Sequence, residues 1–146
     1  MIKKLSLSIV IPVYNEERHL RACLEAIAYQ SEKPEEVIVV DNNSTDNTVQ
    51  IANEFPFVTL IHEKKQGVLA ARTTGFNAVN SDIIGRIDAD TILSHTWVAR
   101  AKHNFLNPKV AAVTGSGYWY DMPLGPSNYH FEHFFKSLIN KYLKDS

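Results

Sequence analysis

Short apolar stretches alternate along this chain with stretches of helical periodicity, and this alternation limits the possible folds more than any other feature. The expected strands are residues 7–13, 36–41, 57–63, 82–88 and 110–117, and the expected helices are residues 15–30, 48–55, 68–80 and 94–107. Because the strands are apolar on both faces, we predict an α/β three-layer sandwich with a mostly parallel central sheet.

Length, charge and cysteine content narrow the class further. The chain has 146 residues, which fits one main domain, and its formal net charge is −1 without a basic run, which argues against a nucleic-acid binder. Cys23 is the only cysteine, so no intrachain disulfide can form and we expect a reducing, cytoplasmic location. The N-terminal lysines and apolar residues resemble a signal peptide superficially, but Pro12 and two glutamates follow, so we interpret this segment as the first strand.

Polar clusters follow each of the first four expected strands. They are PVYNE, DNNSTDNT, KKQGVLAAR and DAD. In an open parallel sheet, ligands bind beyond the carboxyl ends of the strands, at the point where the strand order reverses. These four clusters are therefore the candidates for a binding site.

Four stretches in this order carry a resemblance to a known family: residues 8–27, 37–48, 67–79 and 83–91. Together they resemble the nucleotide-sugar-binding half of the family 2 glycosyltransferases, which have the Rossmann-like GT-A fold. The resemblance implies a nucleotide-diphosphosugar-binding domain over residues 1–117. Residues 118–146 would then be a loop and a C-terminal amphipathic helix, the start of a missing or minimal acceptor region.

The resemblance assigns a nucleobase subsite to the first two clusters. Residues matching Pro12, Tyr14 and Glu16 lie along the uracil and ribose of the donor, and the residue matching Asp41 accepts a hydrogen bond from the base. A planar base needs an aromatic or proline wall and one directional polar partner, which agrees with this assignment. The alternatives are that Tyr14 is a surface turn residue and that Asp41 caps the turn that follows its strand.

Arg72 lies in GVLAARTTG, which resembles the family's glycine and Ala-Arg-Asn pattern with threonine in place of asparagine. An arginine there can face the base or the diphosphate, because its guanidinium suits anionic oxygens. The alternative is an internal salt bridge between Arg72 and one of the nearby aspartates. Asn43 stands where the family often has glycine, and we expect the turn to survive because asparagine tolerates a left-handed backbone.

Asp88, Ala89 and Asp90 form the DAD motif. The resemblance assigns Asp88 to the ribose or to a metal-bound water, Asp90 to direct coordination of Mn²⁺ or Mg²⁺, and Ala89 to the donor-binding loop between them. Such ions prefer hard oxygen ligands and often take only one or two carboxylates from the protein. A bound ion would also offset the repulsion between the two aspartates, whereas the alternative is a hydrated turn without a ligand.

The implied activity is an inverting transfer of a sugar from a nucleotide-diphosphate sugar, favoured to be UDP-linked, to an unknown acceptor that is a glycan, a lipid or a protein. The family's general base is an acid in a later segment, and no stretch of this sequence matches it; Asp121 and Glu132 are the nearest candidates. The alternative function is a nucleotide-sugar-binding module without turnover, which would keep the site and lack the acceptor half.

An apolar stripe marks the last part of the chain, formed by Phe131, Phe134, Phe135, Leu138 and Tyr142. The simplest interpretation is a helix that packs on its own core or on a second copy of the chain. The alternative is a helix that contacts a partner or the inner face of the membrane, since lysines flank the stripe.

Overall fold

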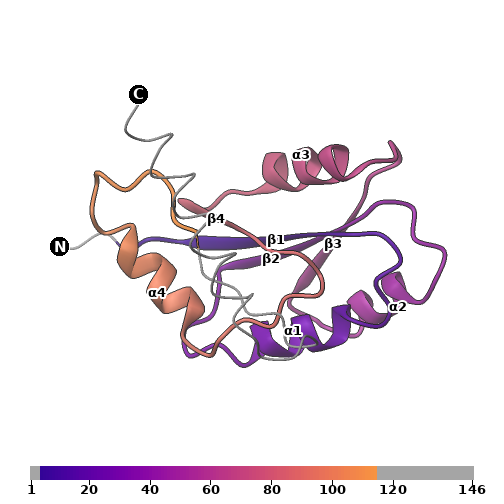
Figure 1. Ribbon diagram of the computed structural model, residues 1–146, viewed down its shortest axis with the longest axis horizontal. Helices are drawn as coiled ribbons and strands as arrows, with labels where there is room; N and C mark the ends of the chain where they lie inside the picture. The colour runs from indigo at the N-terminus through magenta and orange to yellow at the C-terminus, as the bar shows by residue number, and fades with distance from the viewer. Residues whose placement is uncertain (1–3, 115–146) are drawn as a thin grey trace, which may run out of the picture. The chain divides into compact units, whose positions relative to one another are not determined.

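The computed structural model describes residues 4–114, and residues 4–111 belong to one compact unit (Figure 1). Strands and helices alternate in this unit, as the sequence predicts. The strands are β1 (Leu7–Val13), β2 (Glu36–Asp41), β3 (Val58–His62) and β4 (Ile83–Arg86), and the helices are α1 (Leu20–Ala28), α2 (Thr48–Asn53), α3 (Val68–Ala78) and α4 (Trp97–Asn104). Among the described residues, no helix is long and apolar enough to span a membrane.

The four strands form one sheet in the order β3-β2-β1-β4, and all of its pairs are parallel. The predicted α/β fold with a parallel sheet is therefore confirmed. Strand order runs outward from β1 through β2 to β3 and then returns to the other side of β1 for β4. The reversal point lies between β1 and β4, where α/β proteins place their ligands.

Helices cover both faces of this sheet. Helix α3 packs on β1 and β2 from one side, whereas α1, α2 and α4 lie on the other side (Figure 1). The larger core lies on the second side and includes Ile9, Ile11 and Leu24, which are fully buried. On the α3 side, a Cβ at Gly75 would collide with Val10, so glycine is needed for the close approach of α3 to the sheet.

The sequence prediction overestimated the length and burial of the outer elements. Strands β1 and β2 have the predicted bounds, but β4 ends at Arg86. Its residues alternate between buried and exposed because α3 packs on β1 and β2 and leaves the same face of β4 largely uncovered by described residues. Ile84 on this strand is 44% exposed. The predicted strand over residues 110–117 is wrong over its described part: residues 110–114 form no strand, and a turn from Asn107 to Val110 follows α4. Residues 115–117 and the predicted C-terminal helix lie outside the described residues.

Ion pairs hold the amino end of the sheet. Lys102 on α4 is buried, and its Nζ lies 2.9 Å from Glu32 Oε1 and 2.8 Å from Glu35 Oε1. Burial opposes the charged form of Lys102, but hydrogen bonds to the two carboxylates outweigh burial and raise the pKa of Lys102. A cavity of about 380 Å³ beside this cluster is lined by none of the predicted site residues. The two ion pairs of Lys102 therefore tie α4 to the amino end of the sheet.

Candidate functional site

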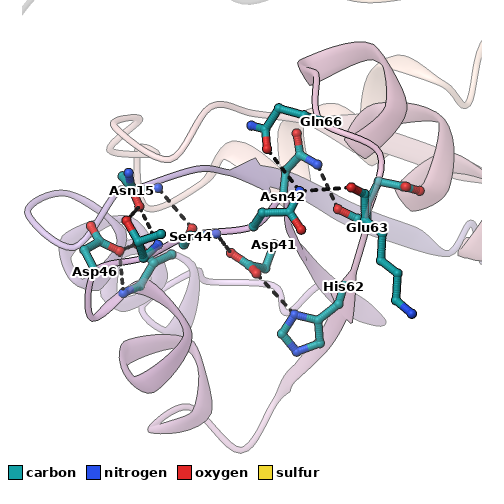
Figure 2. Close-up of polar contacts among 12 residues, drawn as sticks. Asn15, Asp41, Asn42, Ser44, Asp46, His62, Glu63 and Gln66 are labelled. Carbon is teal, nitrogen blue, oxygen red and sulfur yellow. Dashed lines mark hydrogen bonds and ion pairs between the residues drawn. The ribbon is translucent and has the colours of Figure 1, made fainter.

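The loops after β1 and β2 are hydrogen-bonded into one unit at the carboxyl edge of the sheet (Figure 2). Asn15 adopts a left-handed backbone conformation (φ 55°), which lets its amide donate to Ser44 Oγ at 3.0 Å. The Asn15 side-chain oxygen accepts the backbone N–H of Thr45 at 2.8 Å. In the same unit, Asp46 accepts the N–H of Thr48, the first residue of α2. The two loops therefore fix each other's shape.

Asp41, at the end of β2, is only 4% exposed, and both of its carboxylate oxygens have partners (Figure 2). Oδ1 accepts the N–H of Ser44 at 3.1 Å, and Oδ2 lies 3.2 Å from Nδ1 of His62, the residue beside Asp41 in the β2–β3 register. The predicted turn-capping role of Asp41 is thus present in the structure. It is compatible with base recognition, since each carboxylate oxygen has two lone pairs.

Asn42 and Asn43 connect the same loop to the segment that precedes α3. The buried Asn42 side chain donates to the carbonyl oxygens of Glu63 and Lys65, both at 2.8 Å, and accepts the N–H of Gly67 at 2.7 Å. Asn43 has φ 67°, so the turn survives without glycine, as expected. The sequence analysis missed Asn42, because nothing in the sequence distinguishes it from its neighbouring turn residues.

Asp88 is held by two arginines just beyond β4. Arg86 Nη2 lies 3.0 Å from Asp88 Oδ1 and 2.9 Å from Oδ2, and Arg72 Nη2 lies 3.7 Å from Oδ1. The predicted alternative, a salt bridge from Arg72 to one aspartate, is therefore present. The Nε atom of Arg72 is buried and has no hydrogen-bond partner among the described residues. Arg86 was not among the predicted site residues, although a spacing of two residues in an alternating segment puts Arg86 and Asp88 on one face.

Asp90 differs from Asp88 in having no partner among the described residues. Its side chain is exposed and makes no hydrogen bond or ion pair within residues 4–114. Ala89 between the two aspartates is buried, whereas Asp88 and Asp90 are both exposed, and the backbone N–H of Thr91 donates to the carbonyl oxygen of Asp88 at 3.0 Å to close the turn. Beneath this turn, burial and then the charge of Asp90 raise the pKa of the Cys23 thiol to about 12.

The carboxylate oxygens that this turn offers as ligands suit a hard divalent cation. Within the described part of the chain, no three His, Cys, Asp or Glu residues cluster as a metal site, so the protein offers only the carboxylates of Asp88 and Asp90. Mn²⁺ and Mg²⁺ commonly take one or two carboxylates and complete their coordination with water and substrate phosphate. The exposed oxygens of Asp90 fit this chemistry directly, whereas those of Asp88 are engaged by Arg86.

The other predicted site residues lie at the end of β1, between the Asp41 and Asp88 loops. Pro12 is half-buried at the end of the strand, and Tyr14 is 52% exposed, so its ring is accessible to a ligand. The carboxylate of Glu16 lies 3.0 Å from His19 Nδ1, and its backbone N–H donates to Thr48 Oγ1. Sheet order thus brings all the predicted residues to one edge, although Asp41 and Asp88 share no hydrogen bond or ion pair.

A parallel α/β sheet with a strand-order reversal defines a class of domain that binds its ligands, nucleotides among them, beyond the carboxyl ends of the strands. Comparison with known sequences identifies the family within this class. The family model for glycosyl transferase family 2 matches residues 8–146, and the chain belongs to that family. Glycosyltransferase AglE of Haloferax volcanii is 34% identical over 117 residues, which cover 75% of this chain and 36% of the relative. An undecaprenyl-phosphate 4-deoxy-4-formamido-L-arabinose transferase of Serratia proteamaculans is 39% identical over 98 residues, which cover 61% of this chain and 29% of the relative.

Solved structures agree on the fold. TarS of S. aureus in complex with UDP matches 83% of this chain and 40% of its own, with a TM-score of 0.65 and 23% identity. Glucosyl-3-phosphoglycerate synthase from Mycobacterium tuberculosis, in complex with Mn²⁺, UDP and phosphoglyceric acid, matches 62% of this chain and 35% of its own, with a TM-score of 0.55 and 26% identity. The predicted GT-A fold is therefore confirmed. The chain spans well under half the length of these relatives.

Proposed function

We propose that this domain binds a nucleotide-diphosphate sugar, with UDP as the favoured nucleotide, and serves the inverting transfer of the sugar to an acceptor. The observation that carries the proposal is the pair of contrasting carboxylates at one sheet edge: Asp41 is buried and fixed, and Asp90 is exposed and has no partner within residues 4–114. UDP is bound in the TarS and synthase structures of the same fold, which supports the choice of nucleotide.

The nucleobase subsite consists of Pro12, Tyr14, Glu16 and Asp41 in this proposal. Asp41 is held by Ser44 and His62, so its carboxylate keeps one orientation and can accept an N–H from the base without first losing rotamer entropy. The accessible ring of Tyr14 supplies a flat apolar surface beside that carboxylate. The nucleoside would therefore be recognised by residues that are already in place.

The diphosphate lies between Arg72 and Asp90 in this proposal. Asp90 would hold Mn²⁺ or Mg²⁺, with Asp88 and the Ala89 backbone contributing to the donor-binding turn. A divalent ion bound there neutralises the charge that accumulates on the diphosphate as the leaving group departs. The guanidinium of Arg72, whose side chain is 30% exposed, adds a second positive charge for an anionic oxygen of the diphosphate.

In the transfer step, the acceptor oxygen forms a bond to the anomeric carbon while the bond from that carbon to the diphosphate oxygen breaks. The acceptor hydroxyl proton goes to a general base. None of the described residues matches the family's general base, and Asp121 and Glu132 lie outside the described residues. The relative from Serratia takes its name from undecaprenyl phosphate, so a lipid phosphate belongs in the acceptor panel together with glycans and proteins.

The second candidate function is a nucleotide-sugar-binding module without turnover. The observation that favours it is that, within residues 4–114, the site contains only residues assigned to the donor. The two functions share every residue of the donor site and differ only in whether the sugar leaves.

Donor hydrolysis separates the two functions. The purified chain is incubated with Mn²⁺ and a panel of UDP- and GDP-sugars, and released nucleoside diphosphate is measured. An enzyme releases UDP, and Asp90→Ala removes the release, because the leaving group then departs without its stabilising charge. A chain that binds UDP in calorimetry and releases none with any donor or acceptor is the module. A chain that binds none of these nucleotides contradicts both.

A further inference from the structure

We propose that Arg86 is a positioning residue that gives the two acids of the DAD turn different roles. Its ion pair with Asp88 keeps this carboxylate from coordinating the divalent ion, so that Asp90 is the metal ligand of the turn. This inference rests on the proposed function for its biological meaning. Its physical content concerns only Arg86, the two acids and a cation, so it can be tested without a nucleotide.

The geometry around Asp88 is the first argument. Arg86 is the last residue of β4, and the alternation of burial continues unbroken from Ile83 to Asp90. Arg86 therefore projects to the same side as Asp88, and its Nη2 lies within 3.0 Å of both carboxylate oxygens. A metal ion that bound Asp88 directly would have to displace this guanidinium.

Local charge is the second argument. Arg72 Nη2 lies 3.7 Å from the same carboxylate, so Asp88 faces two positive groups. A divalent ion approaching Asp88 meets repulsion from both arginines, and such repulsion matters at these distances even in a solvated site. No comparable group faces Asp90, since its side chain forms no ion pair with any residue in the described range.

The two acids are therefore equivalent in sequence but not in structure. The motif offers two identical carboxylates two residues apart, and a cation alone would be expected to use both. Arg86 removes that equivalence. Asp88 becomes an anchor for two arginines at the diphosphate position, and Asp90 remains a single hard ligand, which leaves more coordination positions for phosphate oxygens and water.

The test is a titration of the free protein with Mn²⁺ alone, followed by electron paramagnetic resonance. Arg86→Met releases Asp88, so Mn²⁺ affinity should rise about tenfold, the size of effect that groups orienting a metal ligand commonly have. Water-proton relaxation should show fewer waters on the bound Mn²⁺, because a second carboxylate replaces water. If the unmodified protein binds Mn²⁺ too weakly to measure, the variant should bring binding into range.

Two matched variants distinguish the freeing of the Asp88 carboxylate for metal binding from the simple loss of a positive charge. Arg72→Met removes the same charge beside the same carboxylate without freeing both of its oxygens. The gain in Mn²⁺ affinity should therefore be smaller, and the number of waters on the bound Mn²⁺ should not change. Arg21→Met removes an arginine that pairs with Glu54 outside the site, and should leave Mn²⁺ affinity unchanged. Adding Asp88→Asn to Arg86→Met should restore both the affinity and the waters.

The inference would be overturned if Arg86→Met and Arg72→Met raised Mn²⁺ affinity equally, or if the Mn²⁺ bound to Arg86→Met had lost no water. Thermal melts check that each variant is folded, and Arg86→Gln replaces Arg86→Met if the latter is not. UDP titrations in chelator run in parallel. Should UDP fail to bind the unmodified protein, the proposed function fails while the Mn²⁺ result still decides the role of Arg86.

Discussion

The loops after β2 and β4 lie on the same edge of the sheet and carry similar polar residues, but they are built in opposite ways. After β2, the side chains of Asp41, Asn42 and Asn43 all bond to backbone groups or to neighbouring side chains (Figure 2). After β4, the described partners of the Asp88 side chain are two arginines, and Asp90 is exposed with no partner in the described part of the chain.

This difference shows how the carboxyl edge of the sheet can combine a rigid loop with a loop that keeps a free carboxylate for a ligand. Hydrogen bonds to backbone groups fix the first loop, so a ligand that contacts Asp41 meets a preorganised carboxylate. In the second loop, the unpaired charge of Asp90 lacks compensation within the described residues, and a cation would supply it. The first loop therefore suits recognition of a neutral base, and the second suits charge neutralisation.

The largest effect that tests this comparison is on stability. Asn42→Ala removes three hydrogen bonds from a buried side chain to the backbone, so the free energy of unfolding should fall by about 3 kcal/mol. Urea denaturation measures the change.

The adjacent Asn43→Gly provides the control. Glycine accepts the left-handed backbone of Asn43 without strain, and the two hydrogen bonds that the Asn43 side chain donates are exposed and compete with water. The free energy of unfolding should therefore fall by about 1 kcal/mol or less. Similar losses in both variants would mean that the loop after β2 is not held by Asn42.

A smaller effect concerns Cys23, which lies beneath the loop after β4. Its pKa is raised from 9.0 to about 12, first by burial and then by Asp90. The unfolded thiol therefore ionises first as the pH rises, so stability is lost above pH 9, by about 1.4 kcal/mol for each pH unit until the folded thiol also titrates.

Denaturation curves at increasing pH measure this loss, and Cys23→Ala should remove it while leaving the background of other titrations. Asp90→Asn should lower the pKa of Cys23, seen in the ultraviolet absorbance of the thiolate, because the charge that raises this pKa is gone. Identical pH slopes with and without the thiol would show that the loop after β4 does not shield Cys23.

Sequence periodicity predicted the bounds of the central strands correctly, but it predicted the bounds of the outer elements less well. Strands β1 and β2 are buried along nearly their whole lengths, so predominantly apolar runs marked their bounds. Strand β4 lies at the edge of the described sheet, where exposed Ile84 still appears apolar in the sequence, so its length was overestimated. The start of α1 was placed too early, because residues 15–19 have helix-forming composition but form the turn that begins at left-handed Asn15.

The candidate site was predictable as a set of positions but not as a set of partners. Strand ends locate Asp41, Asp88 and Asp90 at one edge from topology alone. The sequence could not show that Asp88 is bound by Arg86 while Asp90 is not, because that difference depends on side-chain positions in three dimensions. The same holds for Asn42, whose three partners lie on a segment more than 20 residues further along the chain.

Calorimetric titration with UDP, with Mn²⁺ and with chelator, tests most directly the claim that one edge combines a metal-independent base site with a metal-dependent phosphate site. UDP should bind in both conditions and more tightly with Mn²⁺. Asp41→Ala should weaken binding in both conditions, whereas Asp90→Ala should abolish only the gain from Mn²⁺. A UDP affinity that is the same with Mn²⁺ and with chelator, or an Asp90→Ala variant that keeps the full gain, would contradict the account.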